Sequence, residues 1–278
     1  MTIDSIQNIM LITTTLIYLL ATAGYTLYLF VQKERFQQVS FGLICLGFTN
    51  HAVATGINIW TMEALPVHNL HENLSMAAIC LAGVFITLRF KFNLKILGIF
   101  TAPLLTIMMT TALLIPQTQP ETESILKGFW LISHILLIFM GEAALALACG
   151  AGMLYLLQER AIKKKRRGFF YKRLPSLDLL DSTSYSCLIT GFTMLTMGLI
   201  TGLVYAKLVW GRFWGWDPKE IWSAATWLIY AAILHGRLTS GWQGRRSAIM
   251  TIIGFAVLIF TFLGVNLFIG GHHQIFTK

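Results

Sequence analysis

The sequence predicts an all-α integral membrane protein, a polytopic bundle of about eight transmembrane helices with the N and C termini outside. Hydrophobic residues make up 56% of the 278 residues and charged residues only 12%, whereas soluble domains carry about 25% charged residues. A helix that crosses a bilayer needs about 20 mostly apolar residues. About eight such runs occur, at roughly 9–31, 40–60, 73–88, 96–115, 129–157, 184–209, 221–236 and 247–270.

The first apolar run is expected to remain as a helix. A cleaved signal peptide has a basic start, but residues 1–8 contain Asp4 and no Lys or Arg. The chain has no internal repeat, so we expect a single integral membrane domain over residues 1–278. Its two distinctive connections are a basic cytoplasmic loop at 159–183 and an external tryptophan-rich loop at 207–220.

The net charge of +9 reflects how the chain is oriented in the membrane. Basic residues gather after the odd-numbered apolar runs, most densely in 159–173, and the positive-inside rule places these connections in the cytoplasm. No nucleic-acid partner is needed to explain them. We expect a bacterial plasma membrane, although a thylakoid membrane would impose the same inside–outside logic.

The four cysteines lie inside apolar runs and form no Cys-x-x-Cys pair; they are Cys45, Cys80, Cys149 and Cys187. Buried free thiols are the expected state, and neither a zinc site nor a thioredoxin-like redox pair is predicted from them. Any chemistry that consumes thiols must therefore take them from another chain.

Aromatic residues crowd into the external loop that precedes the seventh run. Five of the eight tryptophans lie between 210 and 227, and the loop itself holds Trp210, Trp214 and Trp216. An interfacial belt would scatter such rings over both membrane faces. One cluster of rigid rings with neighbouring glycines fits a flat apolar ligand. Because Lys207, Arg212 and Lys219 can neutralise acidic substituents on that ligand, the pattern indicates haem.

The loop also contains a helix start. Asp217 is followed by Pro218 and, three residues after Asp217, by Glu220, which is the pattern of a capping box with Pro in the first helical position. We therefore expect the seventh helix to begin here and to anchor the loop.

Histidine is the usual axial ligand of haem iron. The predicted topology brings His134, at the outward start of the fifth run, and His272 and His273, beyond the outward end of the eighth, to the membrane face of the tryptophan loop. His235 lies 15 residues after Glu220, about 22 Å along a helix. It is a candidate ligand for haem that enters from the cytoplasmic side.

The remaining ionisable residues carry less information. His51 is as consistent with a hydrogen-bonded core residue as with function, and His68 and His71 are expected to be solvated loop histidines. Glu142 lies within the fifth run, where an ionisable group is a functional candidate whose partner is still to be found.

The segment from Trp210 to Glu220, with the following helix up to His235, resembles the tryptophan-rich WWD signature of the cytochrome c assembly protein family. The Trp-Asp-Pro-Lys-Glu ending, the upstream Leu174-Pro-Ser-Leu-Asp178 and the eight-helix length resemble the CcsA/ResC branch of the System II cytochrome c biogenesis machinery. The likeness runs from about residue 130 to the C terminus and, more weakly, through 40–90.

This resemblance implies haem delivery to apocytochrome c. Members of the branch act with a CcsB/ResB/Ccs1-type membrane partner, bind haem b transiently and present it for attachment. The resemblance therefore implies one part of a holocytochrome c synthase complex rather than an enzyme that acts alone. The family's haem-binding residues map onto Trp210, Trp214, Trp216 and Asp217, and its external iron ligands map onto His134 and one of the final pair. Counting from Gly264 favours His273 over His272, and the histidine after the loop corresponds to His235.

Three alternatives remain at this point. A CcmC-like haem chaperone shares the same signature. A membrane electron-transfer cytochrome b needs paired histidines at matching depth, which His51 and His235 do not provide. A transporter or scaffold subunit would use the aromatic loop only as an interface anchor and would bind no haem.

Overall fold

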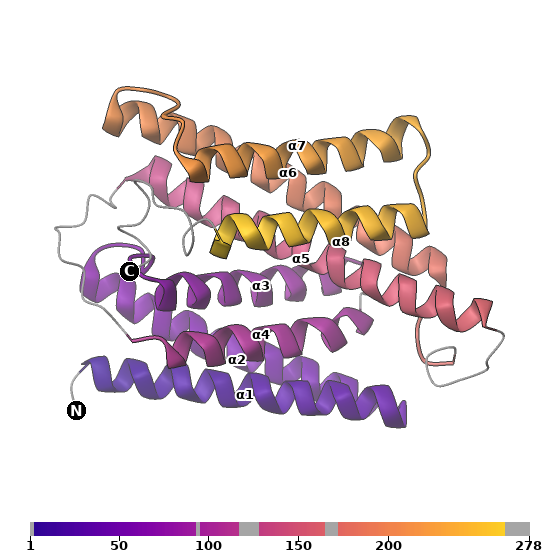
Figure 1. The fold of residues 1–278 in the computed structure, drawn as a ribbon. Coiled ribbons are helices and arrows are strands. Elements are labelled where there is room, and N and C mark those ends of the chain that lie inside the picture. Colours follow the sequence, from indigo (N-terminus) through magenta and orange to yellow (C-terminus); the bar gives the residue numbers. More distant parts are fainter. Residues whose placement is uncertain (1–2, 93–94, 117–127, 165–171, 265–278) are drawn as a thin grey trace. The chain divides into compact units, whose positions relative to one another are not determined.

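The computed structural model describes residues 3–92, 95–116, 128–164 and 172–264, and every regular element in these ranges is a helix (Figure 1). The elements are α1 (Ile3–Val31), α2 (Glu34–Met62), α3 (Leu70–Phe92), η1 (Lys95–Leu97), α4 (Gly98–Leu114), α5 (Phe129–Lys163), α6 (Leu177–Trp210), α7 (Pro218–Thr239), α8 (Arg245–Ile259) and η2 (Phe260–Gly264). The predicted all-α class is confirmed.

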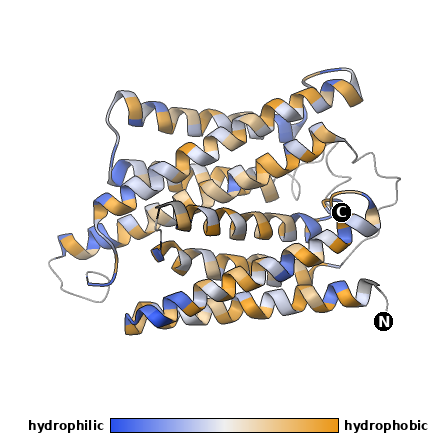
Figure 2. Ribbon diagram, turned by 180° about the vertical axis from the view of Figure 1, so that it is seen from behind, coloured by the Kyte–Doolittle hydropathy of each residue, from blue (hydrophilic) through white to orange (hydrophobic). Residues whose placement is uncertain are grey.

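Seven of these helices are long and apolar enough to cross a membrane. The exception among the eight predicted spans is α7, which lies where the sequence places it but is interrupted by polar residues such as His235 and Arg237. Large hydrophobic side chains are exposed on the other helices, for example Leu20 on α1, Phe90 on α3 and Leu114 on α4. Figure 2 shows hydrophobic residues along the middle of the helices. The chain is an integral membrane protein.

The chain divides into two compact units, and the first contains α1 to α4. Helix α1 packs against α2 and α4, and α3 packs against the same two helices, so the four helices close into a ring. Small residues allow close approach: Gly47 of α2 lies against the Tyr18 ring of α1, and Gly98 at the start of α4 lies against Tyr25. Close packing through small residues is the usual way in which helices associate in lipid.

The second unit, residues 133–274, contains α5 to α8. Helices α5 and α6 meet through glycines, since a Cβ atom at Gly141 would lie 2.9 Å from the backbone nitrogen of Leu195, and one at Gly191 would lie 2.9 Å from the carbonyl oxygen of Gly141. Helix α7 packs against α6 and α8. The glycines therefore set the spacing of the two helices that frame the candidate site.

The two predicted loops are shorter than their sequence ranges. Helix α5 continues to Lys163, where Lys163 pairs with Glu159 one turn earlier, and α6 already starts at Leu177 with Ser176 as its N-cap. Both ends of the basic segment 159–183 are thus helical. In the segment 207–220, only residues 211–217 lie between α6 and α7.

Candidate functional site

The tryptophan loop begins where Gly211 ends α6. The Gly211 backbone has φ 71°, and the Gly211 N–H donates to the carbonyl oxygen of Lys207 at 3.1 Å. This left-handed conformation favours glycine because it has no Cβ. The ammonium group of Lys207 in turn donates a hydrogen bond to the Gly211 carbonyl oxygen at 2.8 Å. Two contacts between the same pair of residues therefore fix the direction in which the chain leaves the helix.

The predicted capping box at the start of α7 is present. Asp217 is the N-cap and accepts from the backbone N–H of Lys219 at 2.9 Å, while the Glu220 carboxylate accepts from the backbone N–H of Asp217 at 3.2 Å. Asp217 is buried, with 7% of its surface exposed. Asp217 thus stabilises the base of the loop, where the resemblance had placed a haem-binding residue.

Glu220 makes one contact beyond the capping box. The same Oε2 atom that accepts from Asp217 also accepts from the backbone N–H of Gly215 at 2.8 Å. Between these two amides lies Trp216, whose backbone has φ 60°. A large residue in the left-handed region is uncommon and signals local strain.

The three loop tryptophans differ in exposure. Trp210 and Trp216 are 47% and 75% exposed, and Phe213 beside them is 56% exposed. Trp214 is half-buried and meets Trp216 edge to face, with 5.9 Å between the ring centroids. Its indole Nε1 is buried, and no described residue accepts a hydrogen bond from it. Buried donors nearly always have a partner, so this unpaired N–H sets Trp214 apart from the other two loop tryptophans, which are exposed.

The tryptophans inside α7 serve the fold. Trp227 stacks on Phe192 with 5.4 Å between centroids and donates from Nε1 to the hydroxyl oxygen of Thr196 at 2.9 Å. Trp222 packs edge to face against Phe260 at 4.7 Å. Of the aromatic cluster seen in the sequence, only the part before Pro218 presents exposed rings.

His134 lies on α5, one turn above its start, and is held against α6. Its Nδ1 lies 2.7 Å from the carbonyl oxygen of Gly198, which also accepts from the Thr201 hydroxyl at 2.9 Å. Because a carbonyl oxygen only accepts, Nδ1 must carry the proton. In the neutral ring Nε2 then carries the lone pair, which is the arrangement found in histidines that ligate metals.

Gly202 makes room for this histidine. A Cβ atom at Gly202 would lie 2.6 Å from His134 Nδ1, so any side chain there would require the histidine ring or the helices to shift. Gly202 precedes Trp210 by eight residues on the same helix, about 12 Å. The second unit thus brings His134 to within two or three helical turns of the tryptophan loop.

Glu142 of α5 has an electrostatic partner in Lys219 of α7, and both side chains are half-buried. Lys219 also interacts with Asp217. This interaction links the start of α7 to the helix that carries His134. Lys207 and Arg212 lie on the exposed part of the loop.

The other predicted iron ligands have different positions. His235 is exposed on α7, near the opposite end of that helix from the tryptophan loop. His272 and His273 fall outside the described residues. In the described part of the chain, no group of three or more His, Cys, Asp or Glu side chains is arranged to hold a metal ion.

The expectation that His68 and His71 are solvated is wrong. The His68 side chain is 9% exposed, with Nδ1 3.1 Å from the Glu72 carboxylate, and His71 is 5% exposed, with Nδ1 2.8 Å from the Ala112 carbonyl oxygen. Asn69 accepts from the Glu72 backbone N–H at 2.9 Å and so caps α3. The sequence contained this signal, since Asn followed three residues later by Glu is a helix-start pattern. His51 is buried and bonds Ser75 at 2.8 Å, which supports its core reading.

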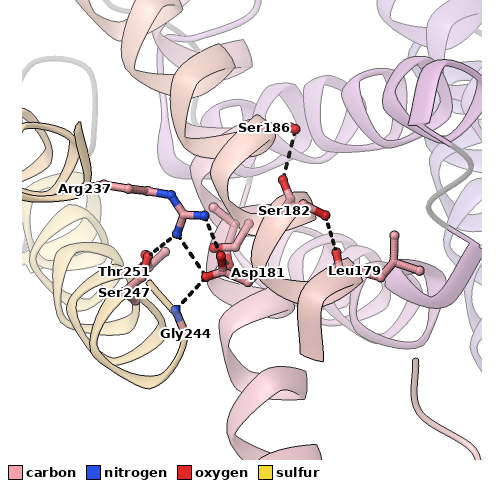
Figure 3. A network of polar contacts seen from close by, with 10 residues as sticks. Leu179, Asp181, Ser182, Ser186, Arg237, Gly244, Ser247 and Thr251 are labelled. Atoms are coloured by element: carbon pink, nitrogen blue, oxygen red, sulfur yellow. Dashed lines mark hydrogen bonds and ion pairs between the residues drawn. The ribbon is translucent and has the colours of Figure 1, made fainter. Parts of the chain in front are cut away.

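A polar network closes the other end of α6 and α7 (Figure 3). Arg237 donates from its two terminal nitrogens to the two carboxylate oxygens of Asp181, at 2.9 and 2.5 Å. Asp181 also accepts from the backbone N–H of Gly244, and Arg237 also donates to Ser247 and lies 4.3 Å from the Tyr185 ring centroid. These residues were not predicted as functional, and their mutual saturation is typical of a structural ion pair.

Comparison with known proteins identifies the family of the chain. The family model described as "Cytochrome C assembly protein" matches residues 67–273, a range that includes His134, the tryptophan loop, His235 and the final histidine pair. The chain belongs to the cytochrome c assembly protein family. Membership confirms the resemblance drawn from the loop and assigns the chain to cytochrome c biogenesis.

Individual relatives within the cytochrome c assembly protein family cover nearly the whole chain. The cytochrome c biogenesis protein CcsA of Guillardia theta is 31% identical over 94% of this chain and 93% of its own length. The CcsA of Synechococcus elongatus is 30% identical over 84% and 87% of the two chains. Among solved structures, the cytochrome c haem lyase CcmF has the same fold, with a TM-score of 0.65 at 16% identity. That likeness covers all of this chain but only 47% of the other.

Proposed function

We propose that this chain holds haem b at the tryptophan loop and presents it for covalent attachment to apocytochrome c, together with a CcsB/ResB-type membrane partner. The observation that carries the proposal is His134, whose Nδ1 is bound to the Gly198 carbonyl oxygen so that Nε2 carries the lone pair. It lies in the same unit as a loop of exposed indole rings.

The loop has the properties that a haem surface requires. Trp210, Phe213 and Trp216 offer exposed aromatic faces for the apolar macrocycle. Lys207 and Arg212 supply positive charge for the propionates, and Trp214 supplies a buried N–H with no acceptor among the described residues. An interfacial anchor would need the exposed rings but not the orphan donor or the oriented histidine.

The residues act on haem as on a transient substrate. His134 and His273, or His272 in its place, would bind the iron from its two sides at the external loop. His235 would bind haem near the other end of α7, with its second ligand supplied by the partner. In the attachment step, each apocytochrome thiol adds across a haem vinyl group, so that sulfur bonds to one carbon and the thiol hydrogen goes to the other. This chain contributes orientation and iron ligation, and its own cysteines take no part, so it would be one component of a holocytochrome c synthase complex.

The relatives come from plastid-bearing organisms and cyanobacteria, and we propose a bacterial plasma membrane or a thylakoid membrane as the location. The loop and both termini would then face the outer or lumenal side. This sidedness follows from the positions of the basic connections.

The experiment is haem titration of the purified full chain, followed by its Soret absorbance. We expect His134→Gly to lose the ligated spectrum and added imidazole to restore it, because imidazole can enter the space of the missing side chain. Ser133→Gly is the matched control, since it places the same residue in the same helix next to the ligand. Unchanged spectra in His134→Gly, or equal loss in Ser133→Gly, would contradict the proposal.

A further inference from the structure

We propose that Glu220 is the positioning residue of the haem-binding loop. Its carboxylate accepts from the backbone N–H groups of Gly215 and Asp217, the residues on either side of Trp216, and thereby holds Trp216 in the left-handed conformation that exposes its indole ring. The inference rests on the proposed haem binding and adds the residue that prepares the loop for it.

A single carboxylate oxygen of Glu220 accepts two hydrogen bonds. Glu220 Oε2 lies 2.8 Å from the Gly215 nitrogen and 3.2 Å from the Asp217 nitrogen. An ordinary capping box requires only the second bond. The first bond spans five residues and encloses Trp216 in a closed turn whose other side is the start of α7.

Trp216 does not adopt this conformation by itself. Its φ of 60° is disfavoured for a residue with a Cβ and a bulky side chain. Such a residue persists only when its surroundings determine its conformation. The bonds from the two flanking amides to a single carboxylate supply that constraint, because releasing either amide would let φ return to the ordinary negative range.

The constraint has a consequence for the ring. Trp216 is 75% exposed and touches Trp214 only edge to face, so an aromatic face stays available instead of stacking on its neighbour. A large apolar side chain on a flexible loop would be expected to collapse onto other apolar surface. A ring that is held in place before the ligand arrives binds it with less loss of conformational entropy.

Other residues of the loop do not provide the same support. Gly211 ends α6 and Gly215 lies against the Arg212 guanidinium group, where a Cβ would be 3.0 Å from a terminal nitrogen. Asp217 holds the first turn of α7 through the Lys219 amide. Glu220 by contrast accepts from the backbone N–H groups of both Gly215 and Asp217, the residues on either side of Trp216.

The test compares Glu220→Ala, Glu220→Gln and Trp216→Ala in the full chain. We expect Glu220→Ala and Trp216→Ala to weaken haem binding by a similar factor, about fivefold to tenfold from the loss of one aromatic contact. The double variant should be no weaker than either single variant. Glu220→Gln should bind haem normally, because an amide oxygen can accept the same two bonds.

A haem-independent readout accompanies the titration. In protein labelled with 5-fluorotryptophan, the fluorine resonance of Trp216, assigned by its loss in Trp216→Phe, should move in Glu220→Ala but not in Glu220→Gln. Ser176→Ala is the matched control, since it removes the N-cap of α6 in the same unit without touching the loop. It should lower the melting temperature and leave both the resonance and the haem affinity unchanged.

The outcomes separate the two proposals. If the wild-type chain binds no haem, the proposed function fails, while the fluorine resonance still decides the role of Glu220. If the wild type binds haem but the Trp216 resonance is unchanged in Glu220→Ala, or if the two single losses add in the double variant, the positioning role is overturned. If Glu220→Ala folds poorly, Glu220→Gln still tests the proposal. A shift of the Trp216 resonance in Glu220→Gln would also overturn the positioning role of Glu220.

Discussion

Helices α6 and α7 meet differently at their two ends. At one end, Asp181 and Arg237 are mostly buried and saturate one another with two hydrogen bonds, and Asp181 also receives the Gly244 N–H. At the other end, the tryptophan loop exposes indole rings, holds Trp216 in a left-handed conformation and leaves the Trp214 N–H without an acceptor among the described residues. The same pair of helices is closed by satisfied polar groups at one end and, at the other, by exposed aromatic rings and one indole N–H without an acceptor among the described residues.

The difference shows how stability and binding are separated along one helix pair. A saturated buried ion pair contributes to the register of the helices and offers nothing to a ligand. Exposed apolar rings, local backbone strain and an orphan donor each cost folding free energy, and such features gather at functional sites. Changes at the first end should therefore alter stability, and changes at the second should alter haem binding.

The largest expected effect is on stability at the ion-pair end. Asp181→Ala leaves the buried Arg237 charge without its carboxylate and should destabilise the protein by about 3 kcal/mol. The measurement is thermal unfolding of the purified chain in detergent. Haem bound per folded molecule should not change. Adding Arg237→Met should recover part of the stability, because the uncompensated charge is then gone. A loss of haem affinity with normal stability would show that the two ends are not separate.

A smaller effect is expected where α6 supports His134, the proposed haem ligand. Gly202→Ala places a methyl group 2.6 Å from His134 Nδ1, so the ring must leave the Gly198 carbonyl oxygen. We expect a stability cost of about 1–3 kcal/mol from overpacking and a loss of haem affinity of about tenfold, equal to about 1.4 kcal/mol.

The control for this change is Gly56→Ala on α2. A Cβ there meets nothing within 4 Å, and alanine is the better helix former, so the variant should be as stable as the wild type or more so. If Gly202→Ala binds haem as well as Gly56→Ala does, His134 does not need its present orientation.

The smallest expected effect concerns the orphan donor. Trp214→Phe keeps an aromatic ring but removes the indole N–H, and we expect haem affinity to fall about twofold to fivefold, as for one modest hydrogen bond. Trp60→Phe on α2 is the matched control, since Trp60 is 79% exposed and lies outside the loop. Equal affinities of the two variants in a haem titration would mean that Trp214 donates nothing to the ligand.

Local features of the site were predictable. The helix start at Asp217 and Glu220 follows from the spacing of capping residues, and its capping box is confirmed. Counting apolar runs also placed His134 near the outward start of the fifth helix, where it lies against α6, and its role as an iron ligand stays a prediction. The solvated interpretation of His68 and His71 failed because it counted polarity alone and ignored the capping pattern from Asn69 to Glu72, which draws these residues into the first unit.

Other features were outside the reach of sequence patterns. The cluster of tryptophans in the sequence contains two groups, and only packing separates the exposed loop rings from Trp222 and Trp227. The Glu220 bond to Gly215 has no spacing rule of its own, because it depends on how the loop turns. The electrostatic partner of Glu142 was likewise invisible, since Lys219 lies 77 residues away in the sequence.

The amino-acid sequence by itself determined that this is an all-helical membrane protein of the cytochrome c assembly family, and where its aromatic loop ends. Apolar length and helix capping are local properties, so they can be read without knowing what the residues touch. Only the tertiary structure decided which nitrogen of His134 carries the proton, which tryptophans stay exposed and what holds Trp216 in place. Those properties depend on contacts between residues far apart in the chain or on the path of a turn. Neither can be predicted from local sequence patterns.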